Sequence, residues 1–345
     1  MKLTKIRAAD FDLEKTLNSG QVFHWEKVGG GFVGAIGDRA VFVEQTKNVL
    51  KVRFGEPSLR LRSGQATPTR EPRVLPGIVE RYFALDHPLE TICDSFPEDS
   101  LMKAARDFCH GLRIIRQPKW ECLATFICSS MKQVAHIRQI SLALRKRFGD
   151  EGRIGNHLVY TFPAPRRLAQ ASEKELHDCK LGYRAKNLRA TARLVSSGQV
   201  NLDTCSALSD VELRKQLCAL PGVGPKIANC VMLFAYERLR AFPIDVWIER
   251  VLRQNYFSGR RKTTSQRLRE FSETYFGEHG GYAQQYLFHY ARMASRTRWL
   301  DPRPSSASEA ESKDPVELTA GSRSGIESLA SRTSSATLQP GLRSE

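Results

Sequence analysis

The stretch LPGVGPKIANC, residues 220–230, constrains the fold more than any other part of the sequence. It joins two segments with helical patterns, VELRKQLCAL at 211–220 and PKIANCVMLFAYERL at 225–239. Pro225 suits the first position of the second helix, because the N–H that proline lacks has no partner there. The apolar stripe of that helix, spaced i, i+4 and i+7, is Ile227, Val231 and Phe234. The sequence therefore predicts two packed helices joined by a tight glycine turn.

The glycine turn offers a site for an anion. The N–H groups of Gly222, Val223 and Gly224 can bind a phosphate together with the positive end of the next helix dipole. Lys226 lies in the first turn of that helix, where the dipole disfavours an ammonium and favours a neutral amine able to form a Schiff base. The simpler interpretation of Lys226 is a phosphate contact. Taken alone, the turn favours DNA binding and leaves the chemistry open.

A second motif, FPIDVWIERVL at 242–252, follows the hairpin. Pro243 precedes Asp245, which can cap a helix that begins at Val246, a role worth about 1 kcal/mol. The alternative role for Asp245 is a carboxylate that faces the same site as Lys226. A glycine turn, a lysine and a Pro-x-Asp in this order are more specific together than any one of them alone.

Composition points to a polyanionic partner. The chain of 345 residues has a formal net charge of +16, a surplus typical of proteins that bind nucleic acid, although charge alone fits a soluble basic protein without such a partner equally well. It has no signal-peptide pattern and no apolar run of about 18 residues, so we expect an intracellular protein without a membrane segment. The eight cysteines form no C-x-x-C pair and no zinc-ligand spacing with histidine. We therefore expect no disulfide, no structural zinc and no iron–sulfur cluster.

Secondary-structure patterns divide the chain. Residues 1–55 predict β-structure, with a hairpin in 31–45 that turns at Gly37-Asp38. Residues 56–76 are rich in Pro, Arg, Ser and Thr and predict a loop or an insertion. Helical patterns then run from about residue 78 to about residue 300.

Two capping boxes mark helix starts within the helical part, Ser172 with Glu175 and Ser209 with Glu212. The tail at 301–345 is serine-rich, has no aromatic residue and few large apolar ones, and so predicts disorder.

The two motifs together resemble the helix-hairpin-helix (HhH-GPD) DNA glycosylase superfamily, and within it a bifunctional 8-oxoguanine DNA glycosylase. The absence of a cysteine cluster after the helical part argues against the endonuclease III and adenine glycosylase types, and Lys226 argues against the alkylbase glycosylases. Five further stretches carry the resemblance: NSGQVFHW (18–25), YFALDHPL (82–89), RQPKWECLATFICSS (116–130), LGYRAKNL (181–188) and GYAQQYLFHYAR (281–292).

This resemblance implies an α+β fold. We expect an N-terminal antiparallel β-sheet domain of the TBP-like type at 1–115, a mostly helical HhH-GPD domain at 116–300 and a disordered tail at 301–345. The active site would lie in the cleft between the two domains. The implied partner is damaged double-stranded DNA, and we expect a monomer that needs no cofactor.

The resemblance also assigns the chemistry. Lys226 falls on the nucleophile that attacks C1′ of the damaged nucleotide, and Asp245 falls on the carboxylate that stabilises charge on the sugar. The Schiff base would then allow β-elimination. The nucleotide must be flipped out of the duplex for this attack.

The base pocket follows in the same way. Gly20 falls on the glycine whose carbonyl accepts the N7–H that 8-oxoguanine has and guanine lacks. Cys230 and Phe288 fall on the residues that sandwich the base, and Gln284 on the residue that binds its Watson–Crick edge. Without the resemblance, Cys230 and Phe288 are ordinary core residues and Gln284 a surface amide.

The resemblance also implies contacts with DNA outside the base pocket. Tyr183 and Arg184 fall on residues that wedge into the stack and bind the orphaned cytosine. The chain departs from the family pattern at three positions, where an asparagine, an arginine and a histidine are replaced by Met131, His136 and Trp247. Preference for cytosine opposite the lesion should therefore be weaker.

Two other functions fit the same residues. A monofunctional glycosylase for another damaged purine would release its base without a covalent lysine intermediate. A non-catalytic helix-hairpin-helix module would use the glycine turn only to hold DNA. Phosphate binding, however, requires none of Lys226, Asp245, Gly20, Gln284 and Phe288.

Overall fold

The computed structural model describes residues 3–55, 75–257 and 263–294. The predicted tail at 301–345 therefore lies outside the described residues. So does the predicted insertion at 56–76, apart from its last two residues, which begin helix α2 (Leu75–Tyr82). The described residues belong to one compact unit, and the boundary between the two predicted domains within it stays a prediction.

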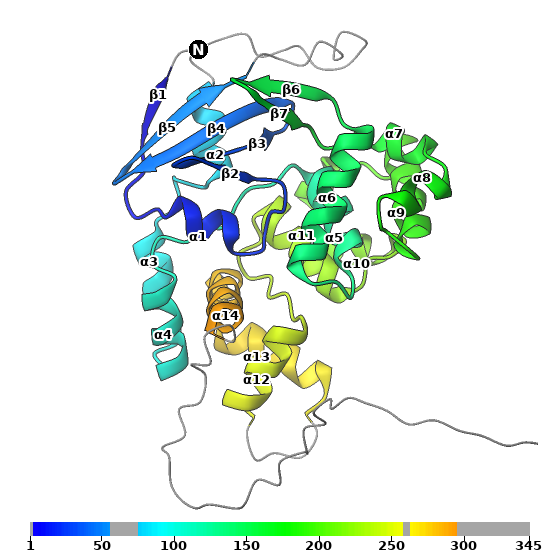
Figure 1. Ribbon diagram of the computed structural model, residues 1–345. Coiled ribbons are helices and arrows are strands. Elements are labelled where there is room, and N and C mark those ends of the chain that lie inside the picture. The colour runs from blue at the N-terminus through cyan, green and yellow to red at the C-terminus, as the bar shows by residue number, and fades with distance from the viewer. Residues whose placement is uncertain (1–2, 56–74, 258–262, 295–345) are drawn as a thin grey trace, which may run out of the picture. The chain divides into compact units, whose positions relative to one another are not determined.

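A five-stranded antiparallel sheet forms the N-terminal part, with strand order β1-β5-β4-β3-β2 (Figure 1). The predicted hairpin is confirmed as β3 and β4, which pair Ile36 with Arg39 and leave Gly37 and Asp38 as the turn. Gly37 has a φ of +59°, which suits glycine at the first position of a two-residue hairpin turn. The strands are β1 (Thr4–Arg7), β2 (Glu26–Val28), β3 (Gly31–Ile36), β4 (Arg39–Thr46) and β5 (Val49–Phe54).

The prediction of β-structure throughout residues 1–55 is wrong at α1 (Leu13–Asn18). Asp12 caps this short helix by accepting a hydrogen bond from the Lys15 N–H at 2.8 Å. Leu13 and Leu17 are buried against the sheet. The helix delivers the chain to the loop that contains Gly20.

Helices make up most of the chain after the sheet, as predicted, and the fold is α+β (Figure 1). Both predicted capping boxes are present, at the starts of α8 (Glu173–Asp178) and α10 (Asp210–Cys218). The two helices predicted on either side of the glycine turn are α10 and α11 (Pro225–Tyr236), and the apolar stripe of Ile227, Val231 and Phe234 on α11 is buried. Besides α2, the helices are α3 (Leu89–Asp94), α4 (Ser100–Phe108), α5 (Lys119–Ser129), α6 (Val134–Phe148), α7 (Pro165–Gln170), α8 (Glu173–Asp178), α9 (Arg184–Ser196), α10 (Asp210–Cys218), α11 (Pro225–Tyr236), α12 (Val246–Asn255), α13 (Ser265–Tyr275) and α14 (Gly280–Ala294).

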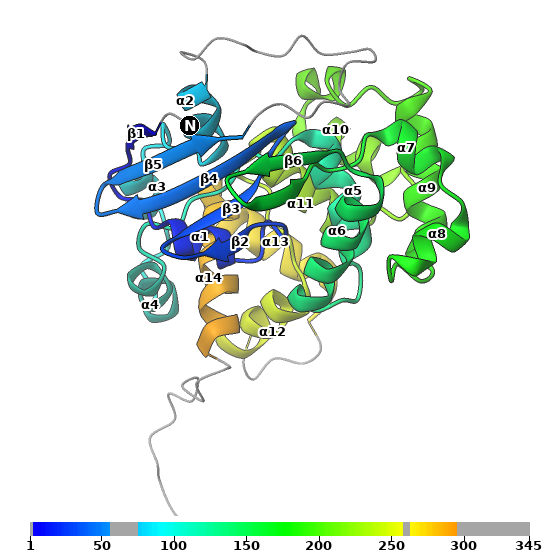
Figure 2. The same ribbon diagram turned by 45° about the horizontal axis from the view of Figure 1, so that its top comes forward.

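A second hairpin interrupts the helices and corrects the prediction of unbroken helix to about residue 300. Strands β6 (Glu151–Ile154) and β7 (His157–Tyr160) pair across a turn at Gly155, and they lie beside β3 and β4 (Figure 2). Ile154 and Val159 pack with apolar residues of those two strands. The hairpin thus ties the helical part of the chain to the N-terminal sheet.

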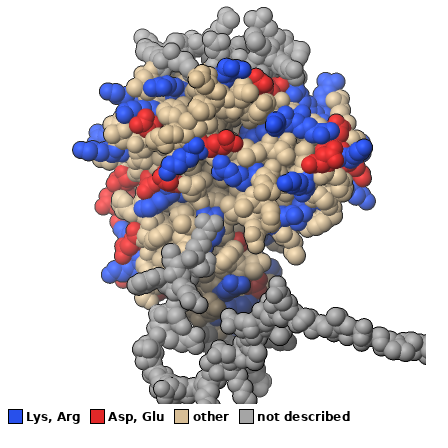
Figure 3. Space-filling model, viewed as in Figure 1, with Lys and Arg blue, Asp and Glu red and all other residues tan. Residues whose placement is uncertain are grey.

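The distribution of charged side chains and the state of the cysteines can be compared with the composition. On the face in Figure 3, Lys and Arg side chains are more widespread than Asp and Glu side chains. All eight cysteines are free thiols, and only Cys218 is not fully buried. In the parts of the chain that the structure describes, no helix has the length and hydropathy of a membrane span.

Candidate active site

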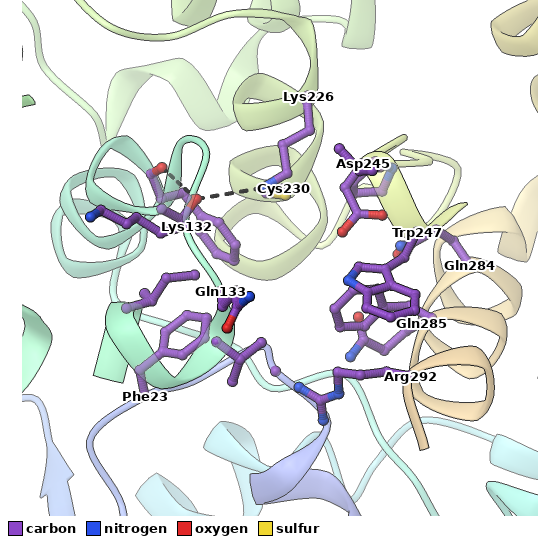
Figure 4. A pocket seen from close by; sticks show the side chains of 18 of the residues that line it. Phe23, Lys132, Gln133, Lys226, Cys230, Asp245, Trp247, Gln284, Gln285 and Arg292 are labelled. Carbon is purple, nitrogen blue, oxygen red and sulfur yellow. Dashed lines mark hydrogen bonds between the residues drawn. The ribbon is translucent and has the colours of Figure 1, made fainter. Parts of the chain in front are cut away.

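A pocket of about 450 Å³ is lined by residues from both ends of the chain (Figure 4). The loop after α1 contributes to one side. The rest comes from α5, α11, α14, the start of α6 and of α12, and the loops that lead into α6 and α12. Seven of the predicted site residues line it: Gly20, Lys226, Cys230, Asp245, Trp247, Gln284 and Phe288. The structure therefore brings together residues that are more than two hundred positions apart in the sequence.

Lys226 reaches the pocket from the first turn of α11, directly after Pro225 at the helix start. Its Nζ donates a hydrogen bond to Ser129 Oγ at 3.4 Å, drawn in Figure 4, and lies 5.4 Å from the centroid of the Phe126 ring. Both partners belong to α5, so the lysine is held against this helix with its amine at the pocket wall.

The position of Asp245 is compatible with both roles considered for it, as a helix cap and as a carboxylate that faces the site of Lys226. It caps α12, where its Oδ1 accepts a hydrogen bond from the Ile248 N–H at 2.9 Å, and it lines the pocket. Burial raises the pKa of this carboxyl above its usual range, although the Ile248 N–H and the charge of Lys226 oppose the shift. The carboxylate is therefore a partly desolvated negative charge close to the lysine.

Three of the predicted residues, Cys230, Gln284 and Phe288, belong to the apolar and amide part of the pocket lining. Cys230 lies one helical turn after Lys226, and burial raises the pKa of its thiol to about 11, so it is uncharged at neutral pH. Gln284 and Phe288 lie one turn apart on α14. Gln284 is only 4% exposed, yet its Oε1 accepts no hydrogen bond from any described residue. A buried acceptor without a donor is costly, so this oxygen is poised for a ligand.

Position 20 requires glycine, both because of its backbone conformation and because neighbouring side chains leave no space for a Cβ. Its φ of +89° is rarely adopted by other residues, and an added Cβ would lie 2.9 Å from the Arg292 guanidinium and 3.0 Å from the Phe288 ring. Among the described residues, none donates a hydrogen bond to the Gly20 carbonyl.

The glycine turn between α10 and α11 differs from the prediction at one residue. Val223 is buried and its N–H donates to the Leu220 carbonyl at 3.1 Å, so this N–H is not available to a phosphate. The N–H groups of Gly222 and Gly224 donate to no residue in the described part of the chain. Gly222 has a φ of +81°, whereas a Cβ added at Gly224 would meet nothing within 4 Å. The fold therefore requires glycine at 222 and leaves open space at 224.

The predicted opposite-strand contacts lie outside the pocket lining. Arg184 is buried; its guanidinium donates to the Ser130 carbonyl at 2.7 Å and stacks on the Tyr183 ring at 4.3 Å. Arg184 thus ties its own loop to the loop that contains Met131. Tyr183 and Met131 are exposed on these tied loops, Met131 with a φ of +54°.

The two remaining departures from the family pattern lie near the pocket. His136 is exposed in the first turn of α6, whose neighbouring residues line the pocket. Trp247 lines the pocket itself, with the Arg250 guanidinium 5.4 Å from its ring centroid.

Sequence reasoning missed several residues that line the pocket. Arg292 could have been found from helical spacing, since it lies one turn after Phe288 on α14. The other missed residues could not be found from local spacing, because they reach the pocket only when separate helices and loops pack together. They include Phe23, Ser129, Gln133 and Gln285.

Known proteins resemble the chain over most of its length. Residues 3–123 match the family model of the 8-oxoguanine DNA glycosylase N-terminal domain, and residues 124–275 match the model of the HhH-GPD superfamily base excision DNA repair proteins. A probable N-glycosylase/DNA lyase of Methanothermobacter thermautotrophicus is 28% identical over 312 residues, which cover 84% of this chain and 96% of that protein.

Solved structures give the same family. The structure of MBOgg1 in complex with a low-affinity DNA ligand is 31% identical, with a TM-score of 0.77 over 86% of this chain and 97% of that one. The Clostridium acetobutylicum 8-oxoguanine glycosylase/lyase, in complex with double-stranded DNA containing cytosine opposite 8-oxoguanine, is 27% identical with a TM-score of 0.75, and the match covers 85% and 98% of the two chains. This chain therefore belongs to the 8-oxoguanine DNA glycosylase family of the HhH-GPD superfamily.

Proposed function

We propose that the protein is a bifunctional DNA glycosylase and AP lyase that excises 8-oxoguanine from duplex DNA in base excision repair. The observation that carries this proposal is the pocket, in which a lysine amine, a half-buried carboxylate and an unpartnered amide oxygen meet beside a glycine carbonyl. The relatives named N-glycosylase/DNA lyase and 8-oxoguanine glycosylase/lyase support the same activity. The partner is damaged double-stranded DNA; the monomeric state stays a prediction.

The chemistry assigns one role to each charged group. The Lys226 amine forms a bond to C1′ as the glycosidic bond breaks, and the base leaves with the electrons of that bond. Asp245 stabilises the positive charge that develops on the sugar. Loss of a proton from the amine opens the sugar to a Schiff base, and removal of a C2′ proton then expels the 3′ phosphate by β-elimination.

Recognition of the base uses the uncharged side of the pocket. The Gly20 carbonyl accepts the N7–H of 8-oxoguanine, whereas guanine would place its N7 lone pair against this oxygen. Gln284 Oε1 accepts an N–H from the Watson–Crick edge, which supplies the donor that this buried oxygen lacks. The Cys230 thiol and the Phe288 ring contact the two faces of the base.

Borohydride trapping on a duplex with 8-oxoguanine opposite cytosine tests the function. We expect a covalent protein–DNA band together with release of the free base. Release of the base without a band would instead indicate a monofunctional glycosylase. Tight DNA binding with neither product would indicate a binding module.

Gly224→Ala is expected to weaken binding to undamaged duplex DNA by about tenfold, because the added methyl group occupies the space through which a phosphate approaches the turn. The melting temperature should fall only slightly, since alanine also adopts the φ of −98° at this residue and is disfavoured only as the N-cap of α11. Fluorescence anisotropy at fixed salt measures the affinity. Gly222→Ala is the contrasting variant and should lower stability by about 1 kcal/mol. Unchanged affinity in Gly224→Ala would exclude the turn from the DNA interface.

Opposite-base selectivity is expected to be weaker than in a relative with arginine at the position of His136. A short imidazole offers fewer donors to cytosine than a guanidinium does, and Met131 is apolar where the family has an amide. Single-turnover excision of 8-oxoguanine opposite C, A, G and T measures this preference. A preference for cytosine as strong as that of the arginine-bearing enzyme would contradict the prediction.

A further inference from the structure

Helix α14 holds the loop that carries the Gly20 carbonyl. Gln285 Nε2 donates a hydrogen bond to the Ser19 carbonyl at 3.0 Å, and the Arg292 guanidinium donates to the Asn18 carbonyl. Gln285 is 3% exposed, so its bond to Ser19 is shielded from water. The two carbonyls that precede Gly20 are therefore both bound by side chains of one helix.

The carbonyl that follows Gly20 is bound as well. Gln117 Nε2 donates to the Gln21 carbonyl at 2.7 Å. The buried Gln21 side chain in turn accepts from the Ile115 N–H at 2.7 Å and donates to the Arg113 carbonyl at 2.8 Å. Carbonyls on both sides of Gly20 thus have donors, whereas no described residue donates to the Gly20 carbonyl itself.

The same helix also carries the residues proposed to contact the base. Gln284, Phe288 and Arg292 follow one another at intervals of one turn, and the Arg292 guanidinium lies 5.4 Å from the Phe288 ring centroid. Figure 4 shows Gln284, Gln285 and Arg292 on this helix at one side of the pocket. One rigid element therefore places the amide and the ring and also fixes the loop opposite them.

We propose that Gln285 is a positioning residue for lesion recognition. By binding the Ser19 carbonyl it sets the direction of the Gly20 carbonyl, and Arg292 supports the same loop by binding the Asn18 carbonyl. The inference rests on the proposed function. Glycine leaves its two peptide planes freer to rotate than any other residue does. Each peptide unit is itself planar and rigid. The bond to the Ser19 carbonyl fixes the plane before Gly20, and the bond to the Gln21 carbonyl fixes the plane after Gln21, so the plane that carries the Gly20 carbonyl lies between two fixed planes. A carbonyl that must meet a single N–H requires such restraint.

Gln285→Met tests the proposal, because it keeps a long buried side chain and removes the donor. Single-turnover excision from a duplex with 8-oxoguanine opposite cytosine should fall by about tenfold. Nicking of a preformed abasic duplex, which needs Lys226 and no base in the pocket, should stay within about twofold of wild type. Arg292→Met, at a partly exposed position, should shift the ratio of excision to nicking in the same direction by a smaller factor. Gln266→Met, on the exposed side of α13, is the matched control and should change neither rate.

The ratio of the two rates separates positioning from stability, since a merely structural role would lower excision and nicking in parallel. An unchanged ratio in Gln285→Met would overturn the inference while leaving the proposed function intact. A wild-type protein that nicks abasic DNA without releasing 8-oxoguanine would overturn the proposed function, and the inference with it.

Discussion

Replacing Lys226 with glutamine is expected to abolish the borohydride-trapped complex and to slow excision of 8-oxoguanine by at least about 10³-fold. The amide has no amine to attack C1′ and cannot form an imine. Lys226 is only half-buried, and the single hydrogen bond that its amine donates to Ser129 Oγ is long, at 3.4 Å. Folding should therefore be preserved, and the loss should be confined to the chemical step.

Lys103→Gln is the matched control for this substitution. Lys103 is exposed on α4 and does not line the pocket, so Lys103→Gln removes one positive charge from the surface and nothing from the site. We expect a trapped band of wild-type intensity from Lys103→Gln. Binding of Lys226→Gln to the lesion duplex, measured by anisotropy, should remain within about tenfold of wild type. A trapped band in Lys226→Gln would show that another amine is the nucleophile.

Local sequence patterns predicted the parts of the site that lie within a few turns of one another. Pro225, Lys226 and Cys230 are placed by helical spacing, and Asp245 is placed by its capping position before Val246. These features depend on short-range geometry, which can be inferred from the types and spacing of neighbouring residues. The β3–β4 hairpin was predictable for the same reason, because its turn requires Gly37.

Features that depend on docking were not predictable from local patterns. The strands of the β6–β7 hairpin are short and weakly patterned, and Ile154 and Val159 become core residues only against the N-terminal sheet. Gly20 and Gln284 are far apart in the sequence, so only the family resemblance placed them in one pocket. Gln285 could not be assigned at all, since its partner is the carbonyl of a distant loop.

Asp245→Asn is expected to slow excision by about 10² to 10⁴-fold while the protein remains at least as stable as wild type. Asparagine caps a helix about as well as aspartate, so the bond from the Ile248 N–H survives. Burial raises the pKa of Asp245 in the folded state, so the stability gained from its bound proton is complete below the unfolded-state pKa and lost as pH rises through the folded-state pKa. At neutral pH the ionised carboxyl therefore costs stability, and asparagine removes that cost.

The pH dependence of excision separates the charge of Asp245 from its role as a helix cap. If the carboxylate stabilises the cationic sugar, wild-type excision falls on acidification as Asp245 is protonated, and the decline begins above the pH range of an ordinary aspartate because burial raises its pKa. Asp245→Asn should lose this part of the profile, and Asp245→Ala should lose both the charge and about 1 kcal/mol of stability from the cap. Single-turnover rates and thermal melts of the three proteins measure both effects. Wild-type excision by Asp245→Asn would mean that the residue only caps α12.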